Sequence, residues 1–260
     1  MANIKEVTVH GSNDWSKLKP INLSRIRPVD FPDDQYHPYE YDKHQITIHH
    51  TVSGDSDGGG RYGGASGDIA SWLSDSARIA TCMIIARNGV AYQCFSSKYW
   101  AHHLGIKSSL LHERGFDDWS SRNVKLNKES ISIEIDSWGW LEKVADNRYK
   151  TYYGNTITLD DNKVIYYPEG YRGKFYFEKY TDEQLKTVGE LLLFWGKRYD
   201  IPLDYKGIEM FDINDKAIGG EPGVWTHTSY RPYPNDNHMK WDCHPQKELI
   251  SMLRTIGNIE

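Results

Sequence analysis

The sequence predicts a single α/β domain with a central mixed β-sheet flanked by helices. Strand patterns and helix patterns are mixed along the chain, no internal repeat occurs, and no Gly/Ser-rich linker divides it. With 260 residues, 38% of them hydrophobic, the chain is long enough to bury a sizeable core. We expect residues 1–43, rich in Pro, Asp and Tyr, to be an N-terminal extension packed on a domain that spans residues 44–260.

The first half of the domain contains three predicted strands and one short helix. Residues 45–49 alternate in polarity as a strand does, and Asp68 is placed to cap a helix that follows it. Residues 79–85 and 90–95 flank Asn88-Gly89, a pair that is typical of a tight β-hairpin. Along the chain, these patterns predict one strand before the short helix and a β-hairpin after it.

The second half of the domain begins with a strand and ends with helices. Residues 130–136 form the strand pattern, and a Tyr-rich β insertion is expected at about 141–179. A capping box starting at Thr181 opens a helix that ends near Tyr199. Pro245 is expected in the first turn of a last helix.

Composition excludes several classes of protein. The net charge of -5 offers no electrostatic case for binding nucleic acid, and three cysteines are too few for a disulfide scaffold. No apolar run reaches 18 residues, so we expect no membrane span. The N-terminus shows no signal-peptide pattern, so we expect synthesis in the cytoplasm. We also expect a monomer.

The first candidate for site chemistry is the pair His49-His50 at the end of the first strand. Neighbouring strand residues point to opposite faces, so one metal rarely takes both. His50 shares a face with Ile46 and Ile48 and is expected to be packed, which leaves His49 as the candidate. A single strand histidine is more often structural than a ligand, so this pattern alone decides nothing.

The second candidate is a histidine followed by a cluster of polar residues. His227 precedes a segment that contains Lys240, Asp242, Cys243 and His244. Two neutral imidazoles and one carboxylate would leave a fourth zinc position open, which is the arrangement of a catalytic site. The alternative interpretation is a polar loop with incidental histidines.

The third candidate is the polar face of residues 130–136. Ser130, Ser132, Glu134 and Asp136 alternate with three isoleucines, so one face of this strand must meet solvent or a polar cleft. Glu134 lies at its centre and could handle a proton beside a metal-activated water. The alternative is an ordinary exposed strand face.

Taken together, these segments resemble the type 2 N-acetylmuramoyl-L-alanine amidases, a family that includes phage endolysins, bacterial amidases and the animal peptidoglycan recognition proteins. The resemblance covers roughly Tyr41 to Leu253, and the motifs occur in the order of the family. The segments that carry it are Ile46-Thr47-Ile48-His49-His50-Thr51, Asn88-Gly89-Val90-Ala91-Tyr92-Gln93, Trp100-Ala101-His102-His103-Leu104-Gly105, Ser130-Ile131-Ser132-Ile133-Glu134, Thr226-His227 and Lys240-Trp241-Asp242.

The resemblance implies one Zn²⁺ per chain in a surface groove of the domain. The family's ligand positions fall on His49, His227 and Asp242, with Cys243 or His244 as alternatives for the third ligand. About fifteen residues separate His227 from Asp242, more than is usual in the family, so a loop is inserted beside the metal.

The resemblance also implies the roles of residues around the metal. Glu134 falls on the catalytic glutamate, and Lys240 is expected to stabilise the oxyanion. His103, or else His102, falls on a groove histidine that contacts substrate. Thr81 stands where many members have a catalytic tyrosine, and Trp100 could stack on a sugar ring of the substrate.

The implied function is a zinc-dependent peptidoglycan hydrolase. It would cleave the amide between the lactyl group of N-acetylmuramic acid and L-alanine, with peptidoglycan as its partner. We expect a phage-type endolysin that reaches the cell wall after release from the cytoplasm. The alternatives are a non-catalytic peptidoglycan-binding module and a cytoplasmic amidase that recycles muropeptides.

Overall fold

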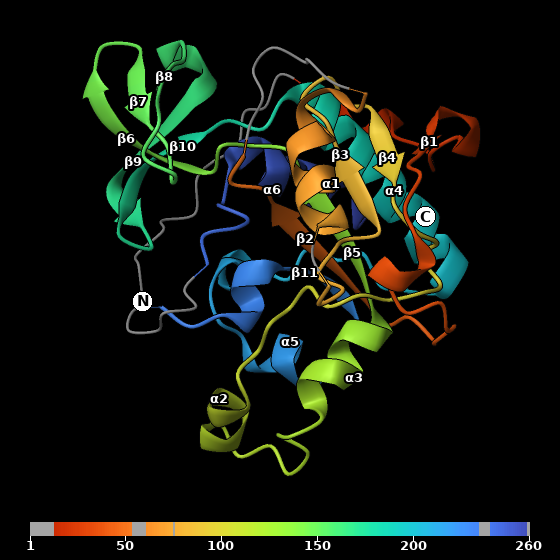
Figure 1. Cartoon of the computed structure of the whole chain (residues 1–260). Helices are drawn as coiled ribbons and strands as arrows, with labels where there is room; N and C mark the ends of the chain where they lie inside the picture. Colours follow the sequence, from red (N-terminus) through yellow and green to blue (C-terminus); the bar gives the residue numbers. More distant parts are fainter. Residues whose placement is uncertain (1–12, 54–60, 75, 234–239, 259–260) are drawn as a thin grey trace.

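A six-stranded mixed sheet forms the centre of the protein, in the order β1-β4-β3-β5-β2-β11. The computed structural model (Figure 1) describes residues 13–53, 61–74, 76–233 and 240–258. The strands of this sheet are β1 (Arg27–Pro28), β2 (Gln45–His50), β3 (Met83–Ile85), β4 (Ala91–Gln93), β5 (Ser130–Ile135) and β11 (Gly223–Thr226). This arrangement confirms the predicted α/β class with a central mixed sheet.

Strands β2 and β5 are buried because parallel strands are covered on both faces. All six residues of β2 are buried, and β2 pairs in parallel with β5 on one side and β11 on the other. The isoleucines of both strands supply the core, while the alternate positions carry the polar residues of the sequence pattern. The same alternation therefore builds the core and aims polar side chains at the opposite face.

Six helices accompany the sheet in the described part of the chain. They are α1 (Ser66–Leu73), α2 (Ser108–Glu113), α3 (Arg122–Glu129), α4 (Asp182–Tyr199), α5 (Asp215–Gly219) and α6 (Lys247–Ile256). The capping box at Thr181 is present, with Gln184 as its second member, and α4 packs against α6 and β3. Among the described residues, no helix combines the length and apolarity that crossing a bilayer requires.

Two expected helix starts were wrong in detail. Asp68 lies in the first turn of α1 rather than at its cap, and its carboxylate instead accepts a hydrogen bond from Ser53 Oγ at 2.5 Å. Pro245 precedes α6, whose N-cap is Gln246. Both residues are compatible with the position predicted and with the one observed, so tertiary contacts decide between them.

The Tyr-rich segment forms a second, antiparallel sheet in the order β8-β7-β6-β10-β9, which projects from the main body at the upper left of Figure 1. Its strands are β6 (Trp140–Ala145), β7 (Arg148–Lys150), β8 (Thr156–Thr158), β9 (Val164–Tyr171) and β10 (Lys174–Glu178). A small core of its own contains Leu141, Tyr149 and Leu159. The insertion is therefore a structured sheet rather than a loop.

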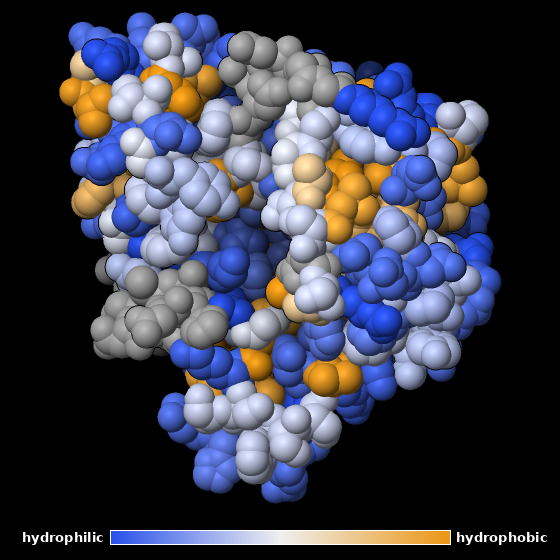
Figure 2. Space-filling view, in the orientation of Figure 1, coloured by the Kyte–Doolittle hydropathy of each residue, from blue (hydrophilic) through white to orange (hydrophobic). Residues whose placement is uncertain are grey.

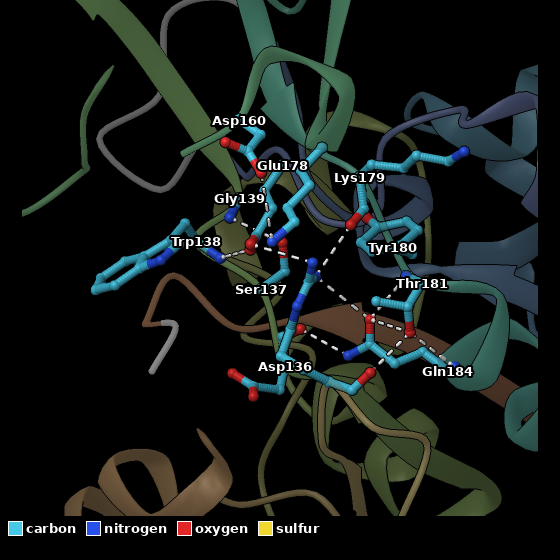
Figure 3. Close-up of polar contacts among 12 residues, drawn as sticks. Asp136, Ser137, Trp138, Gly139, Asp160, Glu178, Lys179, Tyr180, Thr181 and Gln184 are labelled. Carbon is cyan, nitrogen blue, oxygen red and sulfur yellow. Dashed lines mark hydrogen bonds and ion pairs between the residues drawn. The ribbon is translucent and has the colours of Figure 1, made fainter. Parts of the chain in front are cut away.

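A polar seam joins the second sheet to the first (Figure 3). Trp138 N donates to Glu178 Oε2 at 2.7 Å, and Glu178 N donates to the carbonyl of Gly139 at 2.9 Å, so the entering and leaving segments of the insertion are bonded to each other. The guanidinium of Arg87 pairs with Glu178 at 3.2 Å from the main sheet side. These buried charge-assisted bonds fix the orientation of the second sheet.

The chain before β2 lies against the main body. Trp15, Ile21 and Phe31 are buried in the main hydrophobic core, and β1 adds a parallel edge strand beside β4. Residues 13–43 are thus held against the main body by apolar burial and by strand pairing.

Candidate active site

The pairing of β2 with β5 brings the first two site residues together. In this parallel ladder, His49 lies directly opposite Glu134. Paired residues in a ladder project from the same face of a sheet, so the imidazole and the carboxyl group share one face. His49 is buried, and Glu134 is partly buried at the cleft floor.

His227 and Asp242 reach the same place from the end of β11 and from the segment before α6. His227 begins a 3-10 turn directly after β11, and Thr228 N donates to the carbonyl of Asp242 at 3.0 Å. Arg172, in the β9–β10 turn of the second sheet, donates to the carbonyls of Thr228 and Lys240. The second sheet therefore braces both ligand-bearing segments.

The three predicted ligands converge. Oδ2 of Asp242 lies 2.8 Å from Nδ1 of His227 and 3.4 Å from Nδ1 of His49. One ligand atom from each residue falls within 4.8 Å of the others, and all three residues are buried. Within the described residues this is the one group of His, Cys, Asp and Glu side chains close enough to share a metal ion.

The hydrogen bonds of His227 determine which ring nitrogen is available. Its Nε2 lies 3.0 Å from the carbonyl oxygen of Leu104, which can only accept, so Nε2 carries the proton. Burial lowers the pKa of His227 to about 3, so the ring is neutral and Nδ1 presents a lone pair to Asp242. This nitrogen and Oδ2 of Asp242 lie 2.8 Å apart, close enough to be ligands of one metal ion.

A relay of two hydrogen bonds fixes His49 in the same way. Ser130 Oγ donates to the carbonyl of Leu126 at 2.7 Å, so it accepts from Nε2 of His103 at 2.8 Å. The other nitrogen of His103, Nδ1, is therefore an acceptor and takes the proton of His49 Nε2 at 3.0 Å. Nδ1 of His49 is left as a lone pair directed at Asp242.

The donor set fits zinc. Two neutral imidazoles and one carboxylate are ligands that zinc prefers, and a three-residue set is typical of catalytic rather than structural zinc. Outer hydrogen bonds of the kind made by Leu104 and His103 orient ligand histidines in such sites.

Glu134 has the electrostatics of a proton-handling group. Burial raises its pKa well above the ordinary value, and the carboxylates of Asp242 and Asp68 raise it further, while Lys240 acts in the opposite direction. A carboxyl group with a raised pKa holds a proton closer to neutral pH, where general acid–base catalysis is most effective.

The site opens to solvent through a cleft of about 370 Å³. Figure 2 shows the hollow, with hydrophilic residues at its floor, between the second sheet and α1. Lys240 lines this cleft. Thr81 also lines it, but its hydroxyl donates to the carbonyl of Met83 at 3.0 Å and so is already committed to the backbone.

Two of the expected groove residues make their contacts within the protein. His103 lines the cleft, but both of its ring nitrogens are hydrogen-bonded within the protein, Nδ1 to His49 and Nε2 to Ser130. Trp100 is not among the lining residues; it is 6% exposed and stacks on His37 at 3.8 Å between ring centroids. His102, the alternative groove histidine, does line the cleft, and its ring lies edge-on to Trp100.

The alternative third ligands point elsewhere. His244 is fully buried, with Nδ1 2.8 Å from the hydroxyl of Tyr167 and its ring against Tyr180. Cys243 is also fully buried, and burial raises the pKa of its thiol well above the ordinary value. Neither belongs to the convergent group, which contains Asp242 instead.

Sequence reasoning missed the residues that support the ligands. Leu104 acts through its carbonyl oxygen, and no sequence pattern marks such a role. Ser130 was noted only as part of a polar face, and Asp68 only as a helix cap, although it lines the cleft. Tyr152 and Tyr153 of the Tyr-rich insertion also line the cleft.

A sequence model of the N-acetylmuramoyl-L-alanine amidase family matches residues 40–245. The match spans most of the chain, and the chain belongs to this family. It is accordingly an N-acetylmuramoyl-L-alanine amidase, which confirms the enzyme class that the sequence motifs predict, and peptidoglycan is the substrate class.

Solved structures show a distant likeness to the fold. PlyL is 14% identical over 90% of this chain and 99% of its own, with a TM-score of 0.44. An AmpD derivative is 15% identical over 92% and 98%, with a TM-score of 0.42. The endolysin LysCS from Clostridium intestinale is 11% identical over 82% and 88%, with a TM-score of 0.38. No curated protein sequence matches the chain.

Proposed function

We propose that this chain is a zinc-dependent amidase of the endolysin type, which cleaves the lactyl–L-alanine amide in intact cell walls. The observation that carries the proposal is the convergence of His49, His227 and Asp242 beside Glu134 at the floor of an open cleft. Zinc, when bound, supplies Lewis-acid chemistry: it polarises a carbonyl and makes water more acidic.

The protein's own groups account for the movement of protons. Glu134 takes a proton at its carboxylate from the attacking water and returns it to the leaving amino group of L-alanine. Its raised pKa, caused by burial and by Asp242 and Asp68, suits it to both transfers. Lys240 at the cleft edge places a positive charge where the carbonyl oxygen becomes negative, an effect on the order of 3 kcal/mol for one well-placed group.

The residues around the ligands keep the site in order. His103 and Ser130 hold the ring of His49 in the tautomer whose lone pair faces Asp242. The carbonyl of Leu104 does the same for His227. These hydrogen bonds therefore orient the two histidines so that their ligand atoms and that of Asp242 point to one place.

The test of the catalytic assignment is Glu134→Gln, which keeps the shape of the side chain and removes its proton affinity. We expect zinc content equal to that of the wild type and a loss of amide cleavage on the order of 10²- to 10⁴-fold. The control is Glu40→Gln, which makes the same substitution at an exposed carboxyl group on the extension. Full activity of Glu134→Gln would remove the assignment.

Two substrates separate the proposed role from its alternatives. An endolysin degrades purified sacculi, whereas a recycling amidase prefers soluble anhydromuropeptides. A non-catalytic binding module would retain sacculi and release no new L-alanine amino termini from either substrate. The open cleft, which is bordered by a second sheet, favours a polymeric substrate and hence the endolysin role.

A further inference from the structure

A series of aromatic rings leads from a metal ligand to the tip of the second sheet. Trp241, which precedes Asp242, lies 5.9 Å from Trp140 between ring centroids. Trp140 lies 6.0 Å from Tyr152, which in turn lies 5.2 Å from Tyr153. Trp241, Tyr152 and Tyr153 line the cleft of the active site. Trp140, which is not itself a lining residue, thus connects Trp241 to the two tyrosines, and together the rings form an aromatic wall beside the reacting centre.

The two tyrosines occupy an unusual position for aromatic residues. They are the central residues of a tight turn between β7 and β8, closed by a hydrogen bond from Gly154 N to the carbonyl of Thr151 at 2.9 Å. Small polar residues are the usual choice at such positions. Tyr152 is 50% exposed and Tyr153 is 63% exposed, so two large rings face the cleft without burial in the protein. Exposed aromatic surface beside a site marks ligand contact.

The tip is held in a fixed orientation. The seam at Glu178 bonds both ends of the insertion to each other and to Arg87 (Figure 3). Arg172, in the same sheet, donates to the carbonyl of Lys240, and Trp241 Nε1 donates to the carbonyl of Arg172 at 2.8 Å. A preorganised wall binds a ligand without the entropy loss of ordering a loop.

The charge on the wall limits what it can bind. Lys240 is the one lysine or arginine among the described residues that line the cleft, and it serves the reacting carbonyl. Lys174 is not a lining residue; its ammonium group lies over the ring of Trp140 at 3.4 Å and 5.7 Å from the ring centroid of Trp241, so it is engaged by the tryptophans of the wall. Neutral rings with phenol hydroxyls suit a neutral, hydroxyl-rich ring whose C–H face can stack, rather than an acidic peptide that needs cations.

We propose that Tyr152, Tyr153 and Trp241 form a carbohydrate subsite that holds the N-acetylated amino sugars of the glycan next to the cleaved amide. This subsite deepens the proposed function and rests on it for the identity of the polymer. It assigns the second sheet a role in choosing long glycan strands over short soluble fragments.

The experiment measures saccharide binding separately from hydrolysis. N-acetylglucosamine tetramer, a neutral amino-sugar oligomer, is titrated calorimetrically into the protein as purified; the tetramer has no lactyl–L-alanine amide, so turnover plays no part. The variants are Tyr152→Ala/Tyr153→Ala and the stacking-competent Tyr152→Phe/Tyr153→Phe. The matched control is Tyr166→Ala, a 54% exposed tyrosine of the same sheet that does not line the cleft.

We expect the alanine pair to weaken tetramer binding by about tenfold or more, with the phenylalanine pair and Tyr166→Ala within about twofold of the wild type. On sacculi, the alanine pair should raise KM more than it lowers kcat. Binding unchanged in the alanine pair, or no tetramer binding by the wild type, would overturn the subsite. A wild type that binds the tetramer through these tyrosines but cleaves no amide would refute the proposed function and leave the subsite standing.

Discussion

Asp136 offers a quantitative test of the electrostatics beneath the cleft. It follows β5 and is fully buried, and neither carboxylate oxygen has a hydrogen-bond partner among the described residues. In Figure 3 its carboxylate lies outside the network of dashed bonds at the seam. Burial, with the nearby Asp68 and Glu178, raises the pKa of Asp136 to about 8, against a weaker lowering by Arg87.

The direction of the pH dependence follows from that raised pKa. Below about pH 4, Asp136 is protonated in both the folded and the unfolded chain. As the pH rises from 4 to 8, the unfolded chain releases the proton and the folded chain keeps it, so the free energy of unfolding falls. The slope is about 1.4 kcal/mol per pH unit, or about 4 kcal/mol between pH 5 and pH 8.

The variant Asp136→Asn keeps the shape of the side chain and removes its titration. We expect the difference in free energy of unfolding, variant minus wild type, to increase by up to about 4 kcal/mol between pH 5 and pH 8. For a chain of this size, that change corresponds to roughly 10 °C in Tm. Urea unfolding at pH 5, 6.5 and 8 measures the difference. Asp42→Asn, at an exposed position, is the control. Parallel pH profiles for Asp136→Asn and the wild type would refute the reasoning.

Three further variants test separate parts of the account. Ser130→Ala removes the acceptor that fixes the tautomer of His103, so zinc affinity should fall about 10- to 100-fold in a competition titration; unchanged affinity would contradict the relay. Cys243→Ser should keep one zinc per chain by elemental analysis, and loss of zinc would restore Cys243 as a ligand. Gly89→Ala should lower the free energy of unfolding by about 1–3 kcal/mol, because the turn holds φ at +77° and a Cβ would lie 2.7 Å from the carbonyl oxygen of Glu183; denaturant unfolding with an unchanged midpoint would contradict this.

Local patterns were sufficient for the elements that carry the ligands. The alternation of Ile46 and Ile48 with polar residues predicted β2, and the pattern of residues 130–136 predicted β5. Asn88-Gly89 predicted the turn between β3 and β4, although the flanking strands are shorter than expected. Such signals depend on neighbours in the sequence, which is why they can be read without a structure.

The parts that could not be predicted depend on contacts between distant segments. Trp100 has the residue type of a sugar-binding group, but packing against His37 of the extension covers its ring. The role of Leu104 comes from a backbone carbonyl, which every residue possesses. Whether Asp242 or Cys243 faced the histidines depended on the direction of the chain before α6, which residue identity does not specify.

The most direct test of the central claim is zinc content by elemental analysis, measured together with release of L-alanine amino termini from purified sacculi. The proteins are the wild type, His227→Ala and the control His112→Ala, whose exposed imidazole lies outside the site. The account predicts one zinc per chain and amide cleavage in the wild type and the control, with both lost in His227→Ala. A wild type that binds no zinc, or a His227→Ala variant that keeps both zinc and activity, would contradict it.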